Sequence, residues 1–187
     1  MRWVPLVILV YAVLLVQTSL VRLVTFTFGS VGTVGPDLLA AAAVFVAMNC
    51  RSGIDVMLAA WIAGIAADLG TGGTVGGMTA VGPMAISYAL AAGAVFQIRD
   101  AFFRERVWTR FALALLFALL AHGLWVTMQS LLVVRHMTWA DYWRMVLQAV
   151  LIAVYTAAAM PLVYPVLQRV PGLFVAASGA RGRRYYR

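Results

Sequence analysis

Six apolar stretches, each separated from the next by a short polar break, fill almost all of the chain between Trp3 and Gln168. Among the 187 residues, 64% are hydrophobic and only 11% are charged. A water-soluble domain carries roughly 25% charged residues, so the polar surface here is too small to coat a globule in water. The pattern therefore predicts an all-α integral membrane protein.

The chain length suits about six spans of roughly 20 residues with tight loops. We expect a single six-helix transmembrane domain over residues 1–170 and a short basic cytoplasmic tail over residues 171–187. The first stretch lacks a convincing signal-peptidase site, so we expect it to remain as a span. The expected spans are Trp3–Val21, Pro36–Met48, Ile54–Leu69, Met78–Phe96, Phe111–Val134 and Met145–Leu167.

The arginines predict the orientation of these spans. Six crossings that begin inside place only Arg22, Arg135 and Arg144, out of 14 basic residues, on the outer side. Cytoplasmic loops of membrane proteins carry an excess of basic residues, so we expect both termini in the cytoplasm. Topology also accounts for the net charge of +8 without a nucleic-acid partner.

The second and third stretches are short and are joined only by the break at residues 49–53, which predicts a tight helical hairpin. In the third stretch Ala60, Gly64 and Asp68 recur every four residues and therefore share one helix face. Small residues at this spacing let membrane helices approach closely. We expect this face to be a packing seam, with Asp68 directed toward protein.

A glycine-rich segment at residues 70–77, which contains Gly72 and Gly73, connects the third stretch to the fourth. Glycine permits tight turns and close backbone approach, but this composition alone is weak evidence of a ligand site. Pro83 in the fourth stretch predicts a kink or a reshaped helix start.

Three of the ionisable residues within the apolar stretches or at their ends are candidates for a functional site. Membrane carboxylates are costly unless paired or hydrated, so Asp68 is either a proton, ligand or partner site, or a helix-end carboxylate bonded to the glycine-rich loop, which we favour. Asp37 follows Pro36 and suits the positive end of a helix dipole, which favours capping. His122, near Gln129, is expected to hydrogen-bond across helices.

Signatures of enzymes are missing from the sequence. There is no nucleophile elbow, paired-histidine metal motif or phosphate-binding glycine-lysine loop. The acidic residues are scattered, and the single cysteine, Cys50, excludes an internal disulfide and a cysteine metal cluster. We therefore predict no catalytic residue, no metal site and no cofactor.

Three segments together resemble the rod shape-determining MreD family of bacteria. Leu14–Leu20 is similar to the end of the family's first span, with its glutamine followed by small hydroxyl residues. Gly35–Leu39 matches the Pro-Asp-Leu-Leu opening of the second span. Gly64–Gly76 is similar to the family's Gly-x-x-x-Asp-Leu-x-Ser-Gly-x-x-x-Gly signature, although Thr74 stands where proline is usual and Gly77 where a bulky apolar residue is common.

This resemblance implies a non-enzymatic membrane scaffold of the cell-elongation machinery, in the inner membrane of a bacterium. The implied fold is that of the substrate-binding subunits of energy-coupling transporters. The implied partners are membrane lipids and an MreC-type protein with one span and a coiled coil and, indirectly, cell-wall synthases and actin-like MreB. The residues expected to shape the hairpin or the partner groove are Pro36, Asp37, Ala60, Gly64, Asp68, Gly72 and Gly73.

One alternative stays open at this point. A substrate-binding subunit of a small-molecule, vitamin-type transporter has the same general build. It would need a buried pocket with a few well-placed polar groups, and the sequence offers few that could converge.

Overall fold

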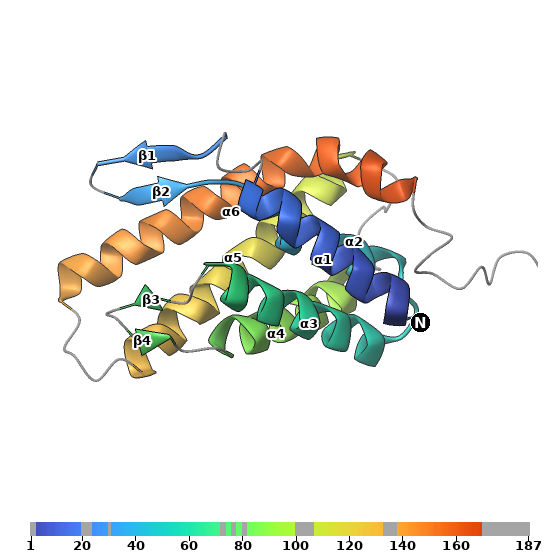
Figure 1. Cartoon of the computed structure of the whole chain (residues 1–187), viewed down its shortest axis with the longest axis horizontal. Coiled ribbons are helices and arrows are strands. Elements are labelled where there is room, and N and C mark those ends of the chain that lie inside the picture. Colours follow the sequence, from blue (N-terminus) through green and yellow to red (C-terminus); the bar gives the residue numbers. More distant parts are fainter. Residues whose placement is uncertain are drawn as a thin grey trace, which may run out of the picture.

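In the computed structural model, the described residues are 3–19, 24–29, 31–71, 74–75, 78–79, 82–99, 107–132 and 138–169. They form six helices and two short antiparallel hairpins (Figure 1). The helices are α1 (Trp3–Ser19), α2 (Leu38–Asn49), α3 (Gly53–Thr71), α4 (Pro83–Ile98), α5 (Val107–Leu132) and α6 (Trp139–Gln168). The strands are β1 (Phe26–Phe28), β2 (Gly32–Val34), β3 (Thr74–Val75) and β4 (Met78–Thr79).

Three of the helices are long and apolar enough to cross a membrane. Their apolar segments are Gly53–Gly70, Trp108–Leu131 and Trp139–Gln168. The other three, α1, α2 and α4, are shorter apolar helices. The predicted predominance of helices is confirmed for the described residues, and each of the six helices overlaps one of the expected spans.

The shortest helix, α2, is the centre of the bundle. It packs against all five other helices, and every residue from Leu39 to Met48 is buried. A helix that is apolar all round has no face to present to water and is stable only in an interior. The alanine run Ala40–Ala43 leaves little side-chain volume, so the surrounding helices approach α2 closely.

Helices α3 and α4 approach each other closely at Gly64. A Cβ atom added there would lie 2.5 Å from the Cα of Ala85 and 2.7 Å from the carbonyl oxygen of Met84. Both of these are backbone atoms, so neither can rotate away. Ala60 and Asp68, which share this face, are buried with Gly64. The small residues therefore allow two backbones to touch.

Arg99 connects the C-terminal ends of α2 and α4. Its side chain, only 5% exposed, donates hydrogen bonds to the carbonyl oxygens of Ala47 and Cys50, at the C-terminal end of α2. Its guanidinium also lies 4.0 Å from the ring centre of Phe96 in α4. The last carbonyls of a helix have no partner within that helix, so Arg99 satisfies two of them.

The two short hairpins were not expected from the sequence, although the described residues are mostly helical, as predicted. Met78 and Thr79 pair with Thr74 and Val75 as strands, so α4 begins only at Pro83. Proline has no backbone N–H and suits the first position of a helix. The first hairpin lies along α6, where Gln148 Nε2 donates to the carbonyl oxygen of Thr33 over 2.9 Å.

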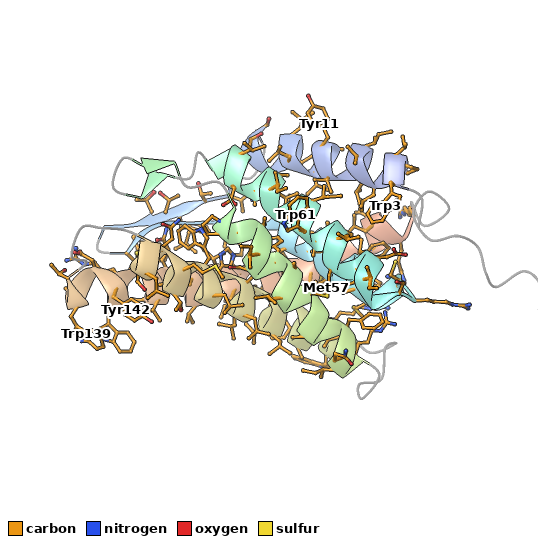
Figure 2. All side chains as sticks on the ribbon, turned by 90° about the horizontal axis from the view of Figure 1, so that it is seen from below. Trp3, Tyr11, Met57, Trp61, Trp139 and Tyr142 are labelled. Atoms are coloured by element: carbon orange, nitrogen blue, oxygen red, sulfur yellow. The ribbon has the colours of Figure 1, made fainter. Side chains whose placement is uncertain are left out.

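Large apolar and aromatic side chains cover the outside of the bundle (Figure 2). Tyr11 is 62% exposed, and Met57 and Trp61 are also exposed. Trp139 lies at one end of the molecule and Trp3 near the other. Such a surface is unfavourable in water, whereas lipid covers it without cost.

The backbone contact at Gly64 predicts that Gly64→Ala will destabilise the protein. The methyl group must push α3 away from α4, and overpacking of this kind costs about 1–3 kcal/mol of unfolding free energy. The matched control is Gly123→Ala in α5, since nothing lies within 4 Å of a Cβ atom added there. Unfolding in mixed detergent micelles measures both; equal stability of the two variants would contradict the close packing.

Candidate functional site

The most polar part of the interior is built around Asp37, the N-cap residue of α2. Its carboxylate accepts a hydrogen bond from the backbone N–H of Ala40 over 3.0 Å, and the side chain is 7% exposed. Pro36 precedes it and is also buried. An aspartate at this position satisfies one of the N–H groups that the first helical turn leaves without a partner.

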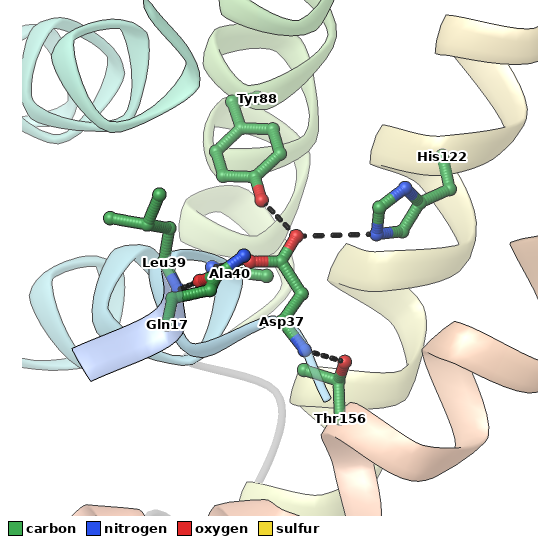
Figure 3. Close-up of polar contacts among 7 residues, drawn as sticks. All are labelled: Gln17, Asp37, Leu39, Ala40, Tyr88, His122 and Thr156. Carbon is green, nitrogen blue, oxygen red and sulfur yellow. Dashed lines mark hydrogen bonds and ion pairs between the residues drawn. The ribbon is translucent and has the colours of Figure 1, made fainter. Parts of the chain in front are cut away.

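Two side chains from other helices reach the same carboxylate (Figure 3). The hydroxyl of Tyr88 in α4 donates to Asp37 Oδ2, and Tyr88 is fully buried. Nε2 of His122 in α5 lies 3.3 Å from the same oxygen. His122 Nε2 makes no hydrogen bond to any described residue, so its contact with the carboxylate is electrostatic. The Tyr88 hydroxyl and the His122 imidazole therefore offset part of the free-energy cost of burying the Asp37 carboxylate.

Two further helices hold the backbone at the start of α2. The N–H of Asp37 donates to Thr156 Oγ1 in α6 over 2.9 Å, and the N–H of Leu39 donates to Gln17 Oε1 in α1 over 3.1 Å. Together with Tyr88 and His122, side chains from α1, α4, α5 and α6 converge on one helix terminus. We call Gln17, Asp37, Tyr88, His122 and Thr156 the Asp37 cluster.

The Asp37 cluster lies partway along the bundle. Arg99 contacts Cys50, and the Tyr164 ring contacts both the Phe45 ring and the Arg110 guanidinium, so α2, α4, α5 and α6 share one end. A rise of 1.5 Å per residue places Asp37 and Thr156 about 18 Å from that end, along α2 and α6 respectively. A hydrocarbon core is roughly 30 Å thick, so the cluster falls at mid-depth when the bundle sits in a bilayer.

A pocket of about 160 Å³ adjoins the cluster. Gln17, Asp37 and His122 supply its polar lining. Its apolar lining consists of Gly35, Pro36, Ala67, Met84 and Ile152.

Asp68 forms a separate polar contact at the start of α4. Its carboxylate accepts a hydrogen bond from the N–H of Gly82 over 2.8 Å, and only 4% of the residue is exposed. Gly82 has a φ of +129°, a conformation that side-chain-bearing residues rarely adopt. The sequence favoured a bond from Asp68 to the glycine-rich segment at residues 70–77, whereas the structure gives it a bond to Gly82, the N-cap of α4.

The predicted site residues fall in two places. Pro36 and Asp37 line the pocket, whereas Ala60, Gly64 and Asp68 lie on the contact between α3 and α4. The predicted Gly72 and Gly73 lie outside the described residues. Among the described residues, no group of three His, Cys, Asp or Glu side chains could hold a metal ion.

Sequence reasoning missed Tyr88 and Thr156 and gave His122 no partner. One signal could have found Tyr88: a tyrosine in the middle of an apolar stretch must place its hydroxyl on a partner. Thr156 offered no such signal, because threonine bonds readily to its own helix.

Comparisons with protein-family models, characterised proteins and solved structures returned no match. The family resemblance therefore stands on the residues quoted for it.

Removing the Tyr88 hydroxyl tests the Asp37 cluster directly. We expect Tyr88→Phe to lower the unfolding free energy by about 1.5–3 kcal/mol, the usual contribution of a hydrogen bond to a charged group. Tyr11→Phe is the control, because Tyr11 is exposed on the outside of α1. Denaturation of both variants in the same detergent gives the comparison, and an unchanged Tyr88→Phe protein would refute the hydrogen bond.

Proposed function

We propose that the protein is a non-enzymatic scaffold of the bacterial cell-elongation machinery, similar to the MreD family. In this role it binds an MreC-type protein in the inner membrane and so supports lateral peptidoglycan synthesis and cell shape. Cell-wall synthases and actin-like MreB filaments are its indirect partners. Membrane lipids surround it.

One observation carries the proposal. Both carboxylates of the family-like motifs stand at helix starts, Asp37 before α2 and Asp68 beside Gly82 at the start of α4. Each accepts backbone N–H groups. A carboxylate used in this way shapes a helix bundle rather than performing chemistry on a substrate, which favours a scaffold over an enzyme.

The proposed topology has six crossings with both termini in the cytoplasm. Three helices have the length and composition to cross alone. The short α2 reaches only about 18 Å, so it depends on the five helices around it for burial at mid-membrane. Aromatic residues at both ends of the molecule, such as Trp3 and Trp139, suit the two lipid–water interfaces.

The carrier alternative has one observation in its favour, the pocket beside Asp37. Its volume of about 160 Å³ is well below the 300–1,000 Å³ that sites for drug-sized ligands occupy. A vitamin-sized ligand therefore does not fit the pocket as it stands, and we rank the carrier second.

The test is isolation of the tagged protein from its native membrane in gentle detergent, with its partners identified by mass spectrometry. The proposal predicts recovery of a single-span coiled-coil protein together with wall synthases. Recovery of ATP-hydrolysing coupling subunits would instead establish the carrier.

Two variants and one control variant then locate the partner contact. Gly64→Leu and Asp68→Leu alter the contact between α3 and α4, whereas Gly123→Leu adds the same side chain where the structure has open space. We expect the first two to reduce recovery of the partner at least several-fold at equal membrane levels, and the third to leave it unchanged. Normal recovery with all three would place the partner contact elsewhere.

A further inference from the structure

The pocket beside Asp37 has features that the scaffold role does not require. It places a buried carboxylate next to an apolar recess, in the middle of a membrane-embedded bundle. Ionisable groups at that depth are expensive and commonly mark a binding or transport site. The inference below does not depend on the scaffold proposal.

Five helices and the segment before α2 contribute to the wall of this pocket. Gln17 comes from α1, Ala67 from α3, Met84 from α4, His122 from α5 and Ile152 from α6, and the segment Gly35–Asp37 leads into α2. Because its lining comes from five helices and the segment before α2, the pocket lies inside the bundle and not on one lateral face. A lipid tail or a laterally docked helix is therefore a poor occupant, and a small solute is a better one.

The direction in which the pocket faces follows from where the helices end. Gln17, Ala67 and Met84 lie in the terminal turns of α1, α3 and α4, so these helices stop at the level of the pocket. In contrast, α5 continues about 15 Å beyond His122, and α6 begins about 20 Å before Ile152. The pocket therefore lies at the level where α1 and α3 end and α4 begins, on the side opposite Arg99.

Charge at the pocket favours a cation. Among the described residues that line the pocket, Asp37 is the only acidic one. No arginine is among these lining residues. An anionic ligand would be repelled.

The carboxylate also has acceptor capacity to spare. A carboxylate offers about four acceptor positions. Ala40 and Tyr88 occupy two of them, and His122 lies against a third. The remaining position, on Oδ1, suits a donor from within the pocket. The apolar walls formed by Met84 and Ile152 suit a short hydrocarbon body.

We propose that this pocket binds a small primary ammonium compound. The ammonium group donates to the carboxylate of Asp37, and the alkyl part packs against Met84 and Ile152. At roughly 30 Å³ for each water-sized unit, the pocket holds about five non-hydrogen atoms, which is the size of n-butylammonium.

The experiment uses the purified full-length protein in neutral detergent, with n-butylammonium as the probe and n-butanol as its neutral isostere. We expect n-butylammonium to raise the unfolding temperature in a saturable manner and n-butanol to have no such effect. Among n-alkylammonium compounds of different chain length, we expect the tightest binding near butyl, and octylammonium should bind at least tenfold more weakly than n-butylammonium. An equal effect of the amine and the alcohol would overturn the proposal.

Two substitutions on one helix separate pocket binding from a general detergent effect. Ile152→Phe fills the pocket without altering a hydrogen bond of Asp37, and Leu162→Phe adds the same ring at a position that is 77% exposed. We expect Ile152→Phe to lose at least tenfold in affinity and Leu162→Phe to bind like the original protein. Unchanged binding by Ile152→Phe would place the ligand elsewhere.

Asp37→Asn tests the charge itself and should weaken binding at least tenfold. Should this variant not fold, the Ile152→Phe and n-butanol results decide the proposal on their own. All of these measurements use the isolated protein, so their results are independent of whether a coiled-coil partner is recovered from the membrane. Failure of one proposal is thus distinguishable from failure of the other.

Discussion

The structure depends on how the buried start of α2 is satisfied. A helix terminus in the interior of a bundle exposes N–H groups to an environment without water, and each one left unsatisfied costs several kcal/mol. Here Asp37 binds the N–H of Ala40, Thr156 accepts from Asp37 and Gln17 accepts from Leu39. Because the partners come from different helices, the same contacts that satisfy α2 also hold the bundle together.

The buried carboxylate of Asp37, which caps α2, must itself be stabilised. A buried charge needs partners of its own, and Tyr88 and His122 supply them from α4 and α5. At the opposite end of α2, Arg99 satisfies two carbonyl oxygens. The central helix is thus held at both ends by polar side chains, while its sides are packed by alanine. This arrangement explains how a 12-residue helix persists at the centre of longer ones.

The sequence predicted the helices well because apolar stretches of this length report directly on burial in lipid. The four-residue spacing of Ala60, Gly64 and Asp68 also predicted a close helix contact, which the structure places between α3 and α4. The hairpins were missed because two- and three-residue strands leave no periodic signal. The grouping of Asp37, Tyr88 and His122 was missed because residues 51 and 85 positions apart become neighbours only through the packing of three helices.

The most direct test of this account is a double-mutant cycle between Asp37 and Tyr88. The unfolding free energies of Asp37→Asn, Tyr88→Phe and the double variant are measured in one detergent system. The account predicts that the two substitutions are coupled by about 0.5–3 kcal/mol, as for residues in one hydrogen-bonded network. Additive effects, with a coupling near zero, would show that the start of α2 is not held by this contact and would contradict the account.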